Sequence, residues 1–322
     1  MVPQAELHVH LEGTAPPELI RRIAQRNRLP VPDGLLADEK TFHYTDFLHF
    51  LRAYDAAASV IRTPEDFRDI TFEYLVARSH EGAIYVELIA APQAAEAVGL
   101  SDADHVAALV QGIDDARAET GVEARILMSA IRNLGPEAAE DVAQRTLAHP
   151  HPYVTGWNLG GDEAGFPPEL FTRAYATVAE AGLGLSCHAG EWAGPESVRG
   201  ALALGVSRLS HGVRAIEDPE LVAELAEREI VLECCPTSNV VLGVYPDFAG
   251  HPFNRLREAG VRLTLGSDDP PYFDATLAGE YAVAREEFGL SDAELRALTR
   301  TALEAAFVQD DVRERLLARV GR

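Results

Sequence analysis

LGLSCHAG, residues 183–190, is a short apolar run that ends near a histidine, and the carboxylate of Glu191 follows it directly. Similar runs rich in Val, Ile and Leu recur along the chain between longer amphipathic segments, an alternation typical of parallel strands covered by helices. The other runs are AELHVH (5–10), AIYVELIA (83–90), ARILMSAI (124–131), YVTGWNLG (153–160), SRLSHG (207–212), IVLECCP (230–236) and VRLTLGS (261–267). Eight such units predict an α/β fold, a (β/α)8 TIM barrel, rather than an open doubly wound sheet.

Helical patterns fill the gaps between these runs, with Pro near the first turn and Gly or a charged residue at the end. Examples are the segments at 16–27, 101–119, 167–182, 194–205 and 218–229. We also expect extra helices at about 35–80, positioned to form a lid over the barrel mouth, and a helical tail from 291 onward. Because no long stretch of Pro, Gly or Ser separates two parts of the chain, 1–322 is predicted to be one barrel domain.

Composition excludes several classes of protein. The net charge of −23 repels phosphate backbones, so a nucleic acid is not expected as a partner. No apolar stretch approaches the roughly 18 residues of a membrane span. The first residues carry neither a basic nor an apolar signal region, and three cysteines cannot form a disulfide framework, so we expect a cytoplasmic protein. The sequence carries no signal for the oligomeric state.

Polar side chains stand at the ends of nearly all the predicted strands. In a parallel barrel these ends share one face, where such folds keep their active sites. The groups are His8 with His10, Glu87, Arg132, the turn at 160–163, His188 with Glu191, His211, the segment 237–239, and Asp268 with Asp269. The sequence therefore predicts one polar site at the carboxyl ends of the strands.

A metal site is the chemistry that these residues favour. His8 and His10 point to the same face because side chains alternate along a strand. His188 would add a third imidazole, and the adjacent carboxylates of Asp268 and Asp269 need a cation or a proton to lie together. An isolated HxH or DDP is more often structural, but in combination three imidazoles and a carboxylate suit zinc with a position left for water.

Two further strand-end groups could serve the chemistry, and the cysteines could not. His211 could orient or deprotonate a water molecule, and Glu191 could carry protons rather than bind metal. Cys234 and Cys235 are adjacent, point to opposite faces of a strand and belong to no CxxC, so we interpret them as packed core thiols.

Six motifs resemble those of the adenosine and adenine deaminase family of the amidohydrolase superfamily. The resemblance covers essentially the whole chain, in order and spacing, and is closest to bacterial adenosine deaminases. The motifs are HVHLEG (8–13), GDE (161–163), HAGE (188–191), SHG (210–212), CPTSN (235–239) and SDDP (267–270). The resemblance implies a purine aminohydrolase of purine salvage that replaces the 6-amino group of its substrate with oxygen and releases ammonia.

The resemblance also implies roles for individual residues. His8, His10, His188 and Asp268 correspond to the ligands of one Zn²⁺ per chain. Glu191 corresponds to the acid that protonates purine N1. In the same way His211 would be the base that orients the attacking water, and Asp269 would bind N7. The substrate-binding set is His10, Glu12, the backbone N–H of Gly161 toward N3, and Asp269.

The substrate is harder to predict than the chemistry. Glu12 stands where adenosine deaminases usually carry Asp and many adenine deaminases carry Glu, which favours a free base. The turn at 160–163 and the segments 193–197 and 211–218 resemble adenosine deaminases instead. We therefore expect adenosine or deoxyadenosine, converted to inosine in the first case, with adenine or a 5'-modified adenosine such as aminodeoxyfutalosine as alternatives.

Other classes fit the sequence less well. A two-metal amidohydrolase commonly uses a bridging lysine, and the single lysine of this chain, Lys40, lies outside every predicted strand. A family member that binds ligand without catalysis would lack some of the predicted metal ligands, and all four are present.

Overall fold

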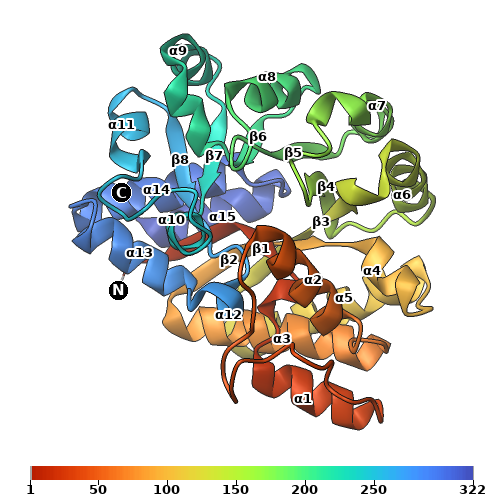
Figure 1. The fold of residues 1–322 in the computed structure, drawn as a ribbon. Helices are drawn as coiled ribbons and strands as arrows, with labels where there is room; N and C mark the ends of the chain where they lie inside the picture. Colours follow the sequence, from red (N-terminus) through yellow and green to blue (C-terminus); the bar gives the residue numbers. More distant parts are fainter. Residues whose placement is uncertain (1, 322) are drawn as a thin grey trace.

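The computed structural model describes residues 2–321 and confirms the predicted barrel. Eight parallel strands pair in sequence order around a nearly closed barrel, and helices surround them (Figure 1). The strands are β1 (Gln4–His10), β2 (Ala83–Ala90), β3 (Glu123–Ile131), β4 (Val154–Gly160), β5 (Gly184–Ala189), β6 (Arg208–His211), β7 (Val231–Cys234) and β8 (Arg262–Leu265). A parallel bridge between Val9 and Asp268 joins β1 to the segment after β8.

The helices follow the strands in the expected order. They are α1 (Pro17–Arg26), α2 (Phe47–Ala58), α3 (Pro64–Glu81), α4 (Pro92–Ala97), α5 (Asp102–Thr120), α6 (Pro136–Ala148), α7 (Thr172–Glu180), α8 (Pro195–Ala203), α9 (Pro219–Glu227), α10 (Pro236–Val241), α11 (Phe253–Glu258), α12 (Pro270–Phe273), α13 (Leu277–Glu286), α14 (Asp292–Ala305) and α15 (Asp310–Val320). Single 3-10 turns are η1 (Glu12–Thr14), η2 (Arg132–Leu134), η3 (Pro168–Phe171) and η4 (Val213–Glu217). Among the described residues no helix is long and apolar enough to cross a membrane.

The predicted insertion at 35–80 is partly wrong at its start. Residues 35–46 are irregular, with one antiparallel bridge between Leu36 and Phe42, and helix begins only at Phe47. The carboxylate of Asp38 accepts hydrogen bonds from the backbone of Lys40 and Thr41, so this segment satisfies its polar groups by turns instead of helix. The helices α2 and α3 supply the rest of the insertion.

The C-terminal segment closes the bottom of the barrel, opposite the predicted site. The ring of Phe307 packs where a Cβ on Gly184 would clash at 2.2 Å, so only glycine leaves room for it. The buried guanidinium of Arg208 lies 3.6 Å from the centre of the same ring and pairs with Glu87 at 2.5 Å and Glu233 at 2.7 Å. These contacts fill the bottom of the barrel, so the site lies at the opposite end.

His105 on α5 makes stability sensitive to acid. It is fully buried against Phe67 of α3, and within 2–321 neither ring nitrogen has a hydrogen-bond partner. Burial lowers the pKa of His105 to about 4, so the fold favours the neutral ring. Its contribution to stability is present above the unfolded pKa of 6.5 and is lost as the pH falls toward 4.

We therefore expect the free energy of unfolding of the unmodified protein to fall between about pH 7.5 and about pH 4.5. In His105→Leu this fall should be smaller by about 2.5 kcal/mol. Urea unfolding at both pH values measures this difference. His80→Leu, which removes an exposed histidine from α3, is the matched control. Equal acid sensitivity of the His105→Leu variant and the unmodified protein would contradict the assignment.

Candidate active site

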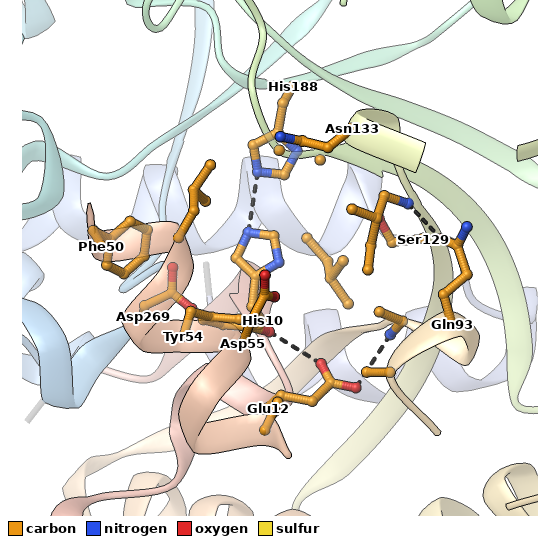
Figure 2. A pocket seen from close by; sticks show the side chains of 18 of the residues that line it. His10, Glu12, Phe50, Tyr54, Asp55, Gln93, Ser129, Asn133, His188 and Asp269 are labelled. Atoms are coloured by element: carbon orange, nitrogen blue, oxygen red, sulfur yellow. Dashed lines mark hydrogen bonds between the residues drawn. The ribbon is translucent and has the colours of Figure 1, made fainter. Parts of the chain in front are cut away.

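A cavity of about 400 Å³ opens at the carboxyl ends of the strands, within the range of small-molecule sites. Helix α2 forms one wall through Phe50, Tyr54 and Asp55, and Gln93 and Asn133 lie on the other side (Figure 2). The predicted site residues that line it are His10, Glu12, Gly161, His188, Glu191, His211, Asp268 and Asp269. His8 lies behind them, fully buried.

The four predicted metal ligands come together at the floor of this cavity. Each of His8, His10, His188 and Asp268 offers an atom, and these atoms all lie within 4.8 Å of one another. Nε2 of His10 is 3.1 Å from Nε2 of His188 and 3.3 Å from Oδ1 of Asp268. Figure 2 draws the contact between the two histidines as a dashed line. Nε2 of His8 lies 3.2 Å from the same carboxylate oxygen, without hydrogen-bond geometry to any described residue. Such a convergence of lone pairs suits a cation.

The far sides of two imidazoles are fixed so that Nε2 faces the cluster. Nδ1 of His188 donates to Oδ1 of Asn158 at 2.9 Å and to the carbonyl of Leu159 at 3.1 Å. Nδ1 of His8 donates to the carbonyl of Glu233 at 3.3 Å. With the ring hydrogen on Nδ1, each neutral ring keeps a lone pair on Nε2, the form that a divalent metal requires. The residues present therefore fit a bound zinc ion.

Backbone strain marks two of the site residues. Asp268 and His211 have φ values of 61° and 65°, in the left-handed region that residues other than glycine rarely adopt. Asp268 is held there by backbone hydrogen bonds to β1, from its N–H to His8 and from the N–H of His10 to its carbonyl. Strain of this kind gathers at functional sites, where surrounding structure enforces it.

Burial and mutual repulsion set the protonation states of the carboxylates. Burial, with the charge of Asp268 next, raises the pKa of Glu191 well above its usual value. The same two causes raise the pKa of Asp269. Burial acts to raise the pKa of Asp268 as well, but the imidazoles of His10 and His8 outweigh it and hold that pKa well below its usual value. The site thus contains one carboxyl that ionises more readily than usual beside two that keep their protons to higher pH than ordinary carboxyls do.

His211 lies between the predicted acid, Glu191, and the predicted metal ligand Asp268. Its Nε2 is 3.6 Å from Oε2 of Glu191 and 3.8 Å from Oδ2 of Asp268. Burial lowers the pKa of His211 to about 3, so the ring is neutral. The predicted acid, the predicted water-orienting histidine and the predicted metal ligands therefore occupy one side of the cavity.

The predicted substrate-binding residues also line this cavity. Glu12 is buried in its wall, where it accepts hydrogen bonds from the hydroxyl of Tyr54 at 3.1 Å and the backbone N–H of Ala91 at 3.3 Å. Burial raises the pKa of Glu12 to about 7. Gly161 has a φ of 111°, and a Cβ there would lie 2.3 Å from the amide oxygen of Asn133, so this turn needs glycine.

Glu163 is a positioning residue whose role the sequence analysis missed. Its buried carboxylate accepts four backbone N–H groups of the loop after β5, at distances from 2.5 to 3.1 Å, and the hydroxyl of Ser197. The four donors belong to residues 190–193, which include Glu191. A carboxylate in the turn after one strand thus fixes the loop that carries the predicted acid. The sequence offered one signal for this role: Glu163 follows β4 and Glu191 follows β5, and these two strands are neighbours in the barrel.

Arg132 supports the same region from below. It is fully buried, and its guanidinium donates to the carbonyl oxygen of His188 at 2.6 Å and to that of Leu159 at 3.3 Å. The cysteines are all buried and free, as expected for core thiols. Sγ of Cys235, however, lies 3.5 Å from Nδ1 of His8, so this thiol packs against a predicted ligand.

Comparisons with known proteins agree with this geometry. The family model described as adenosine deaminase matches residues 3–322. The chain is 47% identical over 316 residues to an adenine deaminase of Sinorhizobium medicae, covering 98% of this chain and 97% of the relative. It is 46% identical over 319 residues to an adenine deaminase of Agrobacterium fabrum, covering 99% and 98%.

Solved structures give the same result. An adenine deaminase from Arthrobacter aurescens superposes with a TM-score of 0.92 at 31% identity, covering 99% of this chain and 98% of the other. An amidohydrolase from Burkholderia ambifaria with bound Zn superposes with a TM-score of 0.90 at 28% identity, covering 99% and 89%. The chain therefore belongs to the adenosine and adenine deaminase family of amidohydrolases and is a purine deaminase.

Proposed function

We propose that the protein hydrolyses adenine to hypoxanthine and ammonia with one zinc ion per chain. The observation that carries the chemistry is the convergence of His8, His10, His188 and Asp268 beside Glu191, a carboxyl whose raised pKa favours the protonated form, in one cavity. Relatives at 46 to 47% identity over nearly the full chain are named adenine deaminase, which supports the free base. These relatives favour adenine, the alternative substrate that Glu12 suggested from the sequence, over adenosine, the substrate first expected.

His8, His10, His188 and Asp268 would hold the metal. When bound, a zinc ion supplies a Lewis acid that makes hydroxide available from water near neutral pH. The protein supplies the remaining groups. The amidohydrolase with bound Zn supports this choice of ion, and three imidazoles with one carboxylate are donors that zinc accepts.

The chain's own residues would bind the purine and move protons. Glu191, whose raised pKa favours the protonated acid, would protonate ring N1, so that C6 becomes a better electrophile. Asp269 would hydrogen-bond N7 and the backbone N–H of Gly161 would meet N3, which aligns C6 with the metal ligands. His211 would orient the attacking water. Ammonia would leave C6 after a proton reaches the amino group.

Substrate choice is tested by ammonia release from adenine, adenosine, deoxyadenosine and a 5'-modified adenosine with zinc-loaded protein. We expect kcat/KM for adenine to exceed that for adenosine at least about 100-fold. A site whose buried polar groups hydrogen-bond one substrate rejects another substrate that leaves those groups unpaired. Adenosine is the second candidate, since the cavity extends beyond Glu12 to Gln93 and Asn133. A preference for adenosine would overturn the proposal in its favour.

Glu12→Asp separates the two readings further. Shortening the side chain withdraws the carboxylate from the cavity and breaks its hydrogen bonds with Tyr54 and Ala91. We expect the adenosine-to-adenine ratio of kcat/KM to rise about 10-fold, with zinc content unchanged. An unchanged ratio would remove Glu12 as the residue that selects the substrate.

Glu163→Gln should show the effect of loosening the loop that carries Glu191. An amide nitrogen would face backbone N–H groups that now donate to a carboxylate oxygen, so two donors would oppose each other. We expect kcat to fall about 30-fold with KM and zinc content nearly unchanged. Asp162→Asn alters the neighbouring carboxylate on the same turn and is the matched control. A parallel loss of zinc would indicate general damage instead.

We also propose that α2 acts as a lid over the small purine bound in the cavity. We further propose that the protein acts in the cytoplasm and has no nucleic acid partner. The ring of Phe47 at the start of α2 packs 4.6 Å from that of Trp192, which lies beyond β5 on the loop that carries Glu191. This contact and the lining by Phe50 and Tyr54 support the proposal that α2 covers the cavity mouth.

A further inference from the structure

A chain of hydrogen bonds runs from the protein backbone to His211. The N–H of Phe253 donates to Nδ1 of His251 at 3.2 Å. Nε2 of His251 lies 3.1 Å from Oδ1 of Asn239, and Nδ2 of Asn239 lies 3.2 Å from Nδ1 of His211. His251, Asn239 and His211 are all buried, so water does not compete along this chain.

The first link sets the direction of every other link. A backbone N–H can only donate, so Nδ1 of His251 must accept and the hydrogen of the neutral ring lies on Nε2. Burial lowers the pKa of His251 to about 3, which keeps the ring neutral. Nε2–H then donates to the oxygen of Asn239, whose amide nitrogen is left to donate to Nδ1 of His211. His211 must therefore carry its hydrogen on Nε2.

The groups at the other end of His211 agree with this direction. Its Nε2 faces Oε2 of Glu191 at 3.6 Å and Oδ2 of Asp268 at 3.8 Å, both of which can accept. The opposite tautomer would require the amide of Asn239 to turn over. Its NH₂ group would then oppose Nε2–H of His251, and two buried donors would face each other at a cost.

We propose that Asn239 and His251 are positioning residues that hold His211 in the Nε2–H tautomer, so that His211 donates a hydrogen bond to the attacking water instead of taking its proton. The consequence for catalysis rests on the proposed function. It replaces the role of base that the sequence suggested for His211. The proton that the water gives up would go to the ionised form of Asp269, whose buried Oδ1 has no partner among residues 2–321.

The tautomer can be observed directly in zinc-loaded protein labelled with ¹⁵N-histidine. Long-range ¹H–¹⁵N correlation spectra distinguish a protonated from an unprotonated ring nitrogen, and His211→Gln identifies the signals of His211 among the 11 histidines. We expect Nε2 of His211 to be protonated and Nδ1 to be unprotonated. In Asn239→Asp, a carboxylate that can only accept should move the hydrogen to Nδ1 or protonate both nitrogens. Protonated Nδ1 in the unmodified protein would overturn the proposal.

His251→Phe and His251→Gln form a matched pair for the second positioning residue. Phenylalanine keeps a ring between Tyr245 and Phe288 but cannot donate, whereas glutamine keeps an N–H for Asn239. We expect mixed tautomers of His211 and a kcat at least about 10-fold lower in His251→Phe, with a smaller change in KM. His251→Gln should restore the single tautomer and most of the loss. A single Nε2–H tautomer in His251→Phe would show that His251 does not set it.

These spectra do not depend on the substrate. If the unmodified protein shows the predicted tautomer but turns over no purine, the proposed function fails and the positioning chain stands. If it deaminates a purine with His211 protonated on Nδ1, the reverse holds.

Discussion

Glu191→Gln is expected to lower kcat at least about 1000-fold while zinc content stays near that of the unmodified protein. A general acid contributes a factor of about 100 to 10,000, and a carboxamide cannot deliver a proton to purine N1. The carboxyl lies 3.6 Å from His211 and outside the cluster of predicted metal ligands, so its loss should leave metal binding intact. Steady-state kinetics with metal analysis by mass spectrometry measures both quantities.

The pH dependence gives an independent check on the same residue. Because burial and Asp268 raise the pKa of Glu191, the protonated form persists to higher pH than in an ordinary glutamate and is lost as the pH rises through that raised value. Deaminase activity should therefore have an alkaline limb that Glu191→Gln lacks. The stability contribution of the carboxyl is present below its unfolded pKa and falls at high pH, so the glutamine variant should be at least as stable at alkaline pH. Retained turnover in this variant would remove Glu191 as the acid.

The barrel and the convergence of the four predicted metal ligands could be predicted because the signals are local. Each strand is an apolar run bounded by turn residues, and β2 has the predicted bounds of 83–90. The groups at strand ends meet because parallel strands bring their carboxyl ends to one face. His8, His10, His188 and Asp268 therefore converge although 260 positions separate the first from the last. Glu87 is the exception among the predicted strand-end groups, since it lies within β2 and pairs with Arg208 at the bottom of the barrel, so its predicted place in the site was wrong.

The parts that could not be predicted depend on contacts between distant segments. The segment 35–46 was expected to be helical although Asp38 stabilises a turn there. Glu163 acts through backbone groups about 28 positions away, which no local pattern reports. The link from His251 through Asn239 to His211 likewise appears only once β6 and the segments after β7 lie side by side.

Asp268→Ala is expected to reduce zinc affinity at least about 100-fold, because it removes the one anionic donor from the predicted set of four. The remaining imidazoles would hold the ion without charge compensation in a buried site. Zinc retained against a competing chelator, measured by mass spectrometry, reports the affinity. Deaminase activity should fall with the metal and recover in part when excess zinc is supplied.

Asp268→Asn separates the loss of the ligand from damage to the barrel. Asp268 has a φ of 61°, a conformation that asparagine tolerates and alanine does not, and its backbone joins β1 through hydrogen bonds with His8 and His10. Asparagine also keeps an oxygen for the hydroxyl of Ser238, which now donates to Oδ2 at 2.6 Å. Asp268→Asn should therefore lose zinc almost as fully as Asp268→Ala but unfold at a higher temperature than Asp268→Ala in the absence of metal. If either variant keeps a full complement of zinc against the chelator, Asp268 is not a ligand, and the metal must be held by the imidazoles and another donor.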